Sequence, residues 1–196
     1  MILILSEREI FFREEQVMRK WFVFLSTVFC SLWGNGCSDP TTAGIPAVTP
    51  FDINAYAGRW YEIARLPNWF ERGLSDISAF YSLEPDGTVK VVNRGFKKGK
   101  VKEITGKAWF AVRPEVGDLR VSFFYPFSSV YKVIYVDNAY SVAVVTGSDY
   151  SRLWILARTP HLEEKTLERV LQWCANLGFE NGNLIFPGFR SEKKCE

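Results

Sequence analysis

Eight short runs of alternating apolar and polar residues follow one another between residues 58 and 158, and this feature constrains the fold most strongly. Alternation with a period of two is typical of β-strands that bury one face. Turn residues such as Glu84-Pro85-Asp86-Gly87 separate the runs, so successive strands are expected to pair as antiparallel neighbours. The spacing favours an eight-stranded up-and-down antiparallel β-barrel, closed on itself. The strands are expected at 58–65, 75–84, 88–95, 102–112, 118–125, 130–137, 140–146 and 152–158.

One helix is expected after the last strand, at roughly 162–177. Thr159-Pro160 interrupts the strand pattern, and an apolar stripe at helical spacing follows it. That stripe should pack on the barrel wall, which makes the fold class all-β with one C-terminal helix. Leu184-Ile185-Phe186 is a candidate for a short final strand. The stripe consists of Leu167, Val170, Leu171, Cys174 and Leu177.

Composition excludes several classes of function. The 24 basic and 22 acidic residues nearly balance, which argues against a nucleic-acid partner. The chain has one histidine and no Cys-x-x-Cys pair, so neither a metal site nor a cofactor is expected. Aromatic residues make up 16% of the chain and are spread through the expected strands, which favours an aromatic-lined interior.

The two ends of the expected barrel differ. Strands reverse at every turn, so the tight turns at 84–87, 114–117 and 137–138 share one end with Trp60 and Arg158. A guanidinium stacked on the indole would close that end, with its donors on nearby carbonyls. The loops at 66–74, 96–101, 126–129 and 147–151 should form the open mouth.

Counting from Trp60 with a period of two predicts which side chains face the interior. The lining mixes aromatic and small residues, which leaves room for an apolar ligand; a solid core of interdigitated side chains is the alternative. The few interior polar groups could hold a ligand headgroup, ordered water or only one another. The residues expected to contact ligand are Glu62, Ala64, Tyr81, Asn93, Phe110, Phe123, Tyr125, Tyr131, Tyr135 and Trp154.

The expected mouth combines aromatic residues with a basic run. Aromatic side chains are expected there at Trp69, Phe70, Phe127 and Tyr150. The run has two interpretations, a solvated hairpin or a surface that touches an anionic bilayer. It comprises Arg94, Lys97, Lys98, Lys100 and Lys102.

The N-terminal region indicates export. Met18-Arg19-Lys20 precedes an apolar stretch from Trp21 to Trp33, typical of a signal peptide over 1–36 with translation starting at Met18. Cys37 then lies where a lipoprotein signal places its lipidated cysteine, and 37–50 is expected to be a tether before a domain over 51–196. Ordinary cleavage that leaves Cys37 as a thiol is the alternative.

A disulfide between Cys174 and Cys195 is also left open.

Three motifs resemble the signatures of the lipocalin family in order and position. They are Gly58-Arg59-Trp60-Tyr61-Glu62-Ile63, Val136-Asp137-Asn138-Ala139-Tyr140 and Arg158-Thr159-Pro160. Further stretches, such as Phe70-Glu71-Arg72-Gly73-Leu74, are similar to bacterial outer-membrane lipocalins of the apolipoprotein D-like branch.

This resemblance implies a lipid-binding envelope protein. It implies that the barrel binds and transports or stores fatty acids such as palmitate, or lysophospholipids, for maintenance of the cell envelope. It also implies a location on the periplasmic side of the outer membrane, with a lipid anchor at Cys37; a homodimer is left open.

Catalysis is not expected. The sole histidine, His161, follows Pro160 far from the mouth loops, so a serine or cysteine nucleophile would lack its usual base. An envelope enzyme that acts on lipids and a structural barrel that binds nothing are the alternatives to a binding protein.

Overall fold

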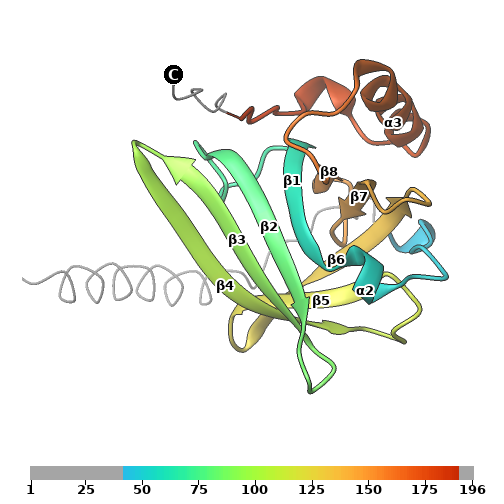
Figure 1. Ribbon diagram of the computed structural model, residues 1–196. Helices are drawn as coiled ribbons and strands as arrows, with labels where there is room; N and C mark the ends of the chain where they lie inside the picture. The colour runs from blue at the N-terminus through green and yellow to red at the C-terminus, as the bar shows by residue number, and fades with distance from the viewer. Residues whose placement is uncertain (1–41, 190–196) are drawn as a thin grey trace, which may run out of the picture. The chain divides into compact units, whose positions relative to one another are not determined.

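The structure is a computed structural model that describes residues 42–189 (Figure 1). The chain divides into two units, Met1–Cys37 and Ser38–Glu196, and all described residues belong to the second. The predicted signal peptide, the start at Met18, the anchor Cys37 and the partner cysteine Cys195 lie outside the described residues.

Eight antiparallel strands close into a barrel in sequence order, each paired with the next and the last with the first (Figure 1). The predicted fold class is confirmed, with strand ends that differ from the predicted ones by up to three residues. The strands are β1 (Gly58–Arg65), β2 (Ser75–Leu83), β3 (Val89–Lys97), β4 (Lys100–Phe110), β5 (Asp118–Phe124), β6 (Phe127–Val136), β7 (Val142–Thr146) and β8 (Leu153–Ala157).

Four register shifts interrupt the strand pairing. They lie between Glu62 and Ala64 in β1, between Ser75 and Ser78 in β2, between Val121 and Phe124 in β5, and between Val133 and Tyr135 in β6. An extra residue in one strand reverses the alternation of faces beyond it. The period-two count therefore fails past each shift, with consequences for the predicted interior.

Buried side chains form two clusters, one on each side of the barrel wall. The inner cluster fills the part of the barrel near the start of β1 and includes Trp60, Tyr81, Val89 and Val133. The outer cluster lies between the wall and helix α3 (Glu164–Asn176) and includes Ile155, Val170 and Cys174. Apolar residues on both faces of β7 and β8 are buried for this reason, since one face meets the interior and the other meets the helix.

Helix α3 confirms the predicted helix and its apolar stripe. Val170 and Cys174 are buried, and Leu167, Leu171 and Leu177 pack beside them. Within residues 42–189 Cys174 has no disulfide partner, and burial raises the pKa of its thiol to about 12, so it packs as a small apolar core residue. Within residues 42–189, no helix has both the length and the apolar character needed to cross a membrane.

The segment before the barrel is packed on it from residue 42 onward. Thr42 is buried and donates its backbone N–H to Ser148, while the Lys132 ammonium donates to the carbonyls of Thr42 and Ile45. Farther along, the Val48 N–H donates to the Val133 carbonyl, and the Val48 carbonyl accepts from the Gly117 N–H. The prediction of a tether over 37–50 is therefore wrong for residues 42–50, because backbone pairing fixes them to β6 and to the turn before β5.

The short C-terminal strand expected at 184–186 is reduced to a single bridge. Ile185 and Arg65 exchange two backbone hydrogen bonds, of 2.8 and 3.0 Å. This bridge continues the end of β1 and brings the C-terminal segment to the barrel end opposite Trp60.

Candidate functional site

A stacked pair of Trp60 and Arg158 lies at one end of the barrel. Trp60 is fully buried, and the guanidinium carbon of Arg158 lies 4.0 Å from the centre of its ring system. Arg158 donates to the carbonyl oxygens of Arg59, Ala55, Tyr56 and Tyr140 at 2.7 to 3.1 Å. The contact expected from the sequence is therefore present, and all three nitrogens of the guanidinium have partners.

The chain reaches this arrangement through Gly58 and a short helix. Gly58 begins β1 with a φ of +94°, and a Cβ there would lie 3.4 Å from the Arg158 guanidinium. Helix α2 (Ile53–Tyr56), capped by Asp52, crosses the same end and offers two of the carbonyls. The indole N–H of Trp60 donates to the Tyr56 carbonyl at 2.7 Å. This closed end is thus held by directed polar contacts as well as by packing.

Three tyrosine hydroxyls form a chain just inside the closed end. Tyr131 lies in the middle, 2.7 Å from the Tyr56 hydroxyl and 2.8 Å from that of Tyr81. Burial raises the pKa of all three hydroxyls, so they remain neutral at physiological pH. Each hydroxyl has a partner, and the chain forms a satisfied polar floor above the closed end.

Above this floor, the inner wall carries apolar side chains that stay partly exposed. Ala79, Val121 and Phe123 pack against the inner cluster without being fully buried. Ile104 lies opposite Asn93 on the same face and is 37% exposed. Gly106 leaves space for the Phe123 ring, since a Cβ there would come within 2.6 Å of it. The inner half toward the open end is therefore apolar and incompletely filled.

Seven of the ten side chains predicted to contact ligand lie on the inner face of the barrel. Their role in binding stays a prediction, but their positions follow from strand pairing and from the inner cluster. They are Glu62, Tyr81, Asn93, Phe110, Phe123, Tyr131 and Trp154.

The other three lie elsewhere, and the predictions for them are wrong. Ala64 and Tyr135 follow the register shifts in β1 and β6, so both pack in the outer cluster; the Tyr135 ring lies 5.4 Å from that of Trp173 in α3. Tyr125 lies beyond the end of β5, in the turn to β6, and is 95% exposed.

A buried ionic cluster lies inside the open end. The same shift in β1 turns Arg65 toward Glu62, and the Arg65 side chain is only 2% exposed. One terminal guanidinium nitrogen donates to Glu62 Oε1 at 2.7 Å, and the other donates to the backbone carbonyl of Glu71 at 3.0 Å. The Glu71 carboxylate lies 3.4 Å from Arg65 Nε and accepts from the Trp154 indole at 3.1 Å. Loop 66–74 is thereby fastened to β1 and β8.

The cluster has two carboxyl groups and one cation. Burial and the neighbouring Glu71 raise the pKa of Glu62 to about 8, against the opposing effect of Arg65. At neutral pH the Glu62 carboxyl is therefore mainly protonated, and Arg65 balances Glu71. A neutral Glu62 carboxyl can donate a hydrogen bond as well as accept one.

Two buried polar atoms near the open half lack hydrogen bonds within the described part of the chain. They are Asn93 Oδ1 on β3 and Arg65 Nε. Buried polar atoms are nearly always satisfied, so such atoms indicate a place where a ligand or water supplies the partner. Arg65 Nε faces the Glu71 carboxylate at 3.4 Å, so Asn93 is the group that offers a free acceptor to a polar headgroup.

The open end carries exposed aromatic and basic side chains. Trp69 is 71% exposed, while Phe70 lies between it and Trp154, with ring centroids at 5.8 and 6.5 Å respectively. Phe127 is also exposed. Tyr150, expected at the mouth, instead packs on Phe179 in the outer cluster, 4.9 Å between ring centroids.

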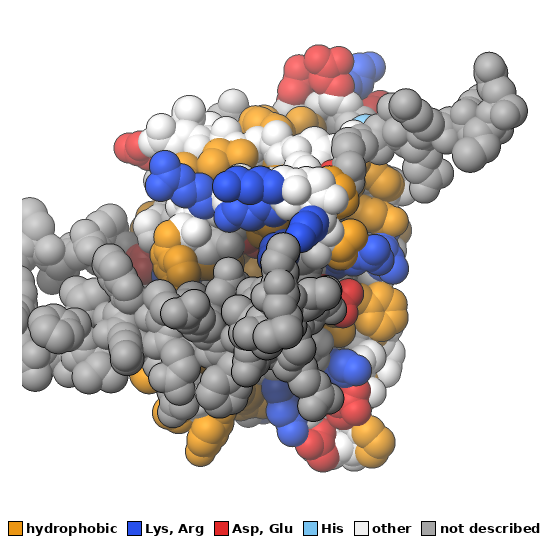
Figure 2. All heavy atoms as spheres, turned by 90° about the vertical axis from the view of Figure 1, so that its left-hand side faces the viewer, with side chains coloured by type: hydrophobic (Ala, Val, Ile, Leu, Met, Phe, Trp, Pro, Cys, Tyr) orange, Lys and Arg blue, Asp and Glu red, His pale blue; other side chains and the backbone are white. Residues whose placement is uncertain are grey.

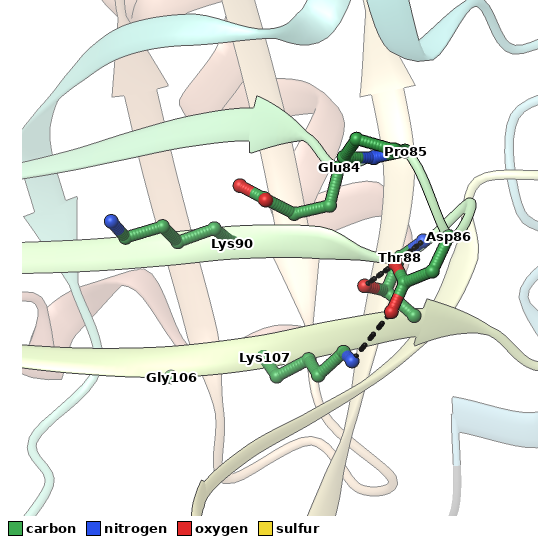
Figure 3. A pocket seen from close by; sticks show the side chains of 7 residues that line it. All are labelled: Glu84, Pro85, Asp86, Thr88, Lys90, Gly106 and Lys107. Atoms are coloured by element: carbon green, nitrogen blue, oxygen red, sulfur yellow. Dashed lines mark hydrogen bonds and ion pairs between the residues drawn. The ribbon is translucent and has the colours of Figure 1, made fainter.

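A surface pocket on the outside of the barrel does not belong to this site. It has a volume of about 430 Å³ and lies beside the turn between β2 and β3 (Figure 3). Its polar lining includes the exposed ion pair of Lys107 and Asp86, at 2.8 Å. Residues 42–189 hold no group of three or more His, Cys, Asp or Glu side chains placed to bind a metal.

The strand pattern does not predict three of the interior polar groups, Arg65, Glu71 and Tyr56. Arg65 falls on the outside by period-two counting, and Glu71 and Tyr56 lie outside the strands. One signal was available for Arg65. A charged residue directly after Ile63-Ala64 and before Leu66 occupies an apolar run, where only a paired charge is tolerated.

The chain matches a family model over most of its length. The model for the lipocalin-like domain covers residues 51–188. The outer membrane lipoprotein Blc of Vibrio cholerae is 41% identical over 81% of this chain and 94% of its own length. Blc of Escherichia coli K12 is 41% identical over 76% of this chain and 86% of its own. Apolipoprotein D of Macaca fascicularis is 36% identical over 67% and 71%.

Solved structures agree on the fold. Insecticyanin of the tobacco hornworm Manduca sexta matches with a TM-score of 0.65 at 22% identity, over 81% of this chain and 89% of its own. The cockroach allergen Per a 4 matches with a TM-score of 0.61 at 21% identity, over 77% and 96%. At such identities the likeness concerns the fold alone. The barrel, its stacked Trp60–Arg158 end and the family match together show that the chain belongs to the lipocalin family.

Proposed function

We propose that this lipocalin binds single-chain lipids, fatty acids or lysophospholipids, inside its barrel and transports or stores them for maintenance of the cell envelope. As a lipocalin it is a binding protein for hydrophobic ligands. The observation that most supports a single-chain lipid as the ligand is the inner wall toward the open end. There Ala79, Val121 and Phe123 face inward but stay partly exposed. An acyl chain would complete their burial.

The energetics favour an acyl chain over a mainly polar ligand. Each buried methylene contributes about 0.8 kcal/mol, so ten of them supply about 8 kcal/mol before ordering costs. The polar groups inside are few and mostly engaged with one another. Affinity should therefore depend on chain length more than on headgroup, and binding is non-covalent.

The headgroup belongs at the open end in this proposal. Asn93 presents an unsatisfied acceptor there, whereas the tyrosine hydroxyls near the closed end satisfy one another. The acyl chain would extend from this region toward Tyr81. The protein acts by sequestering the lipid, without a catalytic step.

Its location is the outer membrane, facing the periplasm and anchored by lipid. The 41% identity to Blc, named as an outer membrane lipoprotein in Vibrio cholerae and Escherichia coli, supports this. Cys37 is the proposed attachment point, after a signal peptide that is removed. Cys37→Ser should shift the protein from the membrane fraction to the soluble periplasmic fraction; continued membrane association would exclude this anchor.

Lipid binding is tested by filling the interior. A fluorescent fatty acid is titrated into the purified protein and displaced with unlabelled fatty acids of increasing length. Ala79→Phe should weaken binding about tenfold or more, because the added ring occupies the proposed chain path. Val121→Phe provides a second filling change at a different strand.

The control adds the same ring outside the barrel. Thr105 is exposed on the outer face of β4, opposite Val92, so Thr105→Phe should leave affinity unchanged. Thermal unfolding establishes that each variant is folded. Equal affinity in the filled variants, the control and the parent would place the ligand elsewhere and overturn the proposal.

A further inference from the structure

The open end of the barrel concentrates exposed aromatic side chains. Trp69 on loop 66–74 is 71% exposed, and Tyr125 in the turn between β5 and β6 is 95% exposed. Phe124 beside that turn is exposed as well. Exposed apolar groups gathered on a soluble domain mark an interaction surface, and aromatic rings favour the boundary between water and lipid.

Basic side chains lie at the same end. The hairpin of β3 and β4 pairs Lys97 with Lys100 directly and places Lys102 opposite Gly95. Like charges opposite each other destabilise a sheet, so this arrangement is unfavourable without an anionic partner. Within residues 42–189, Lys98, Lys100 and Lys102 form no ion pair.

Two contacts bring the basic hairpin beside the aromatic loop. The Lys97 ammonium donates to the Arg72 carbonyl at 2.7 Å, and a Cβ on Gly73 would lie 3.7 Å from the Lys97 side chain. Figure 2, which views the side that carries this hairpin in Figure 1, shows Lys and Arg side chains in a band with hydrophobic ones around them. These contacts place the basic hairpin beside loop 66–74, which carries Trp69.

We propose that the surface formed by Trp69, Lys98, Lys100 and Lys102 docks the open end of the barrel on an anionic lipid bilayer. The inference rests on the proposed function, because docking there lets a single-chain lipid pass between membrane and barrel interior without crossing water. The Trp69 ring enters the interface, and the lysines contact acidic headgroups. Lipid attachment at Cys37 would bring the protein to a membrane, whereas this surface would orient the mouth toward it.

The experiment measures how tightly the exported full-length protein binds to lipid vesicles. The protein carries Cys37→Ser, so that no acyl anchor contributes. Co-sedimentation is compared on phosphatidylglycerol and phosphatidylcholine vesicles at low and high salt. The parent should bind phosphatidylglycerol at least tenfold more tightly, with the preference lost at high salt. Equal binding to both lipids at low salt overturns the proposal.

Variants locate the surface. Replacing Lys98, Lys100 and Lys102 by Gln should weaken binding to phosphatidylglycerol about a hundredfold, at about fivefold for each lysine. The matched control replaces Lys90, Lys107 and Lys165, which lie on the outer wall and on α3, and should lose less than threefold. Equal losses in the two triple variants would show a general charge effect and overturn the proposal.

Trp69 gives a direct reading of contact. Phosphatidylglycerol with brominated chains should quench part of the tryptophan fluorescence of the parent, and Trp69→Phe should remove most of that quenching while binding persists. Quenching unchanged in Trp69→Phe would exclude contact through this loop.

Displacement of the fluorescent fatty acid in vesicle-free solution is measured in parallel. Intact solution binding with failed docking overturns only this inference, whereas loss of solution binding in the parent overturns the proposed function.

Discussion

The two ends of the barrel use arginine in opposite ways. At the closed end, Arg158 lies over Trp60 and donates only to backbone carbonyls, so no carboxylate is needed to hold it. Toward the open end, Arg65 lies buried between Glu62 and Glu71, where its charge and theirs depend on one another. The contacts of Arg158 therefore do not depend on the protonation of a neighbouring carboxyl group. The cluster that fastens loop 66–74 at the open end, in contrast, contains Glu62, whose protonation changes with pH.

The comparison extends to the exposed surface. Trp60 at the closed end is fully buried, whereas Trp69 at the open end is largely exposed. Exposure of a large aromatic ring to water is energetically unfavourable, and exposed rings gathered on one surface often mark a binding site. We infer that the closed end contributes stability and the open end contributes exchange with ligand and membrane. The predictions that follow test this division, beginning with the largest expected effect.

Removal of the Arg65 charge should be the most damaging single change. Arg65→Met leaves the Glu62 and Glu71 carboxyls buried without a cation and should cost about 3 to 5 kcal/mol of unfolding free energy at pH 7. Urea unfolding measures this. Adding Glu71→Gln, which removes the charge that Arg65 balances, should restore part of the stability, and no restoration would show that the cluster is not electrostatically coupled.

The pH dependence of stability should carry the signature of Glu62. The folded protein holds this proton up to a pH of about 8, whereas an unfolded glutamate releases it near 4.5, so the folded state binds more protons between these values. The contribution is fully present below pH 4.5 and is lost as pH rises through 8, by about 5 kcal/mol.

Glu62→Gln should flatten this slope and leave the variant relatively more stable at pH 9. The exposed Glu103 on the outer face of β4 provides the control, since Glu103→Gln should keep the slope of the parent. Unfolding free energies from pH 5 to 9 give the comparison. A slope unchanged by Glu62→Gln would assign the titration to another group.

Arg158→Ala should reduce stability with little effect on ligand affinity. The change exposes the Trp60 ring face and leaves carbonyls of α2 without donors, at a cost of about 1 to 3 kcal/mol. Thermal unfolding and fatty-acid displacement are measured on the same sample. Collapse of lipid binding at unchanged melting temperature would mean that Arg158 contacts ligand, and the division between the two ends would fail.

Tyr131→Phe should have the smallest of these effects. It removes the middle hydroxyl of the chain and leaves those of Tyr56 and Tyr81 without their shared partner, at a cost of about 1 to 2 kcal/mol. Tyr140→Phe removes a hydroxyl that accepts from the exposed Asp52 backbone and should cost less. A larger loss in the control than in Tyr131→Phe would argue against a buried, mutually satisfied chain.

Local patterns were sufficient to predict the strands, the closed barrel and the C-terminal helix. Turn residues mark nearly every reversal, and Leu167, Val170 and Cys174 have the spacing of one helical face. The interior was harder, because its prediction depends on unbroken alternation. The register shifts in β1 and β6 moved Ala64 and Tyr135 to the outside and Arg65 to the inside.

The place of Glu71 in the ionic cluster could not be predicted from local sequence patterns, for a different reason. Glu71 enters the cluster because loop 66–74 folds back over the mouth, with Asn68 bonded to both its backbone and its carboxylate. Such a contact is set by tertiary packing and leaves no periodic signal. Residues 42–50 show the same effect, since their Pro- and Thr-containing sequence suggests a tether while backbone bonds to Val133 and Gly117 fix them.

Photo-crosslinking tests the central claim most directly, namely that an acyl chain enters through the open end and occupies the inner half of the barrel. A fatty acid with a diazirine at its terminal methyl is bound, irradiated and located by mass spectrometry. Crosslinks should fall on inner-wall residues near the tyrosine floor, such as Tyr81, Val91 and Phe110, and disappear in Ala79→Phe. Crosslinks confined to the groove beside α3, at Leu162 and Phe186, would contradict the account.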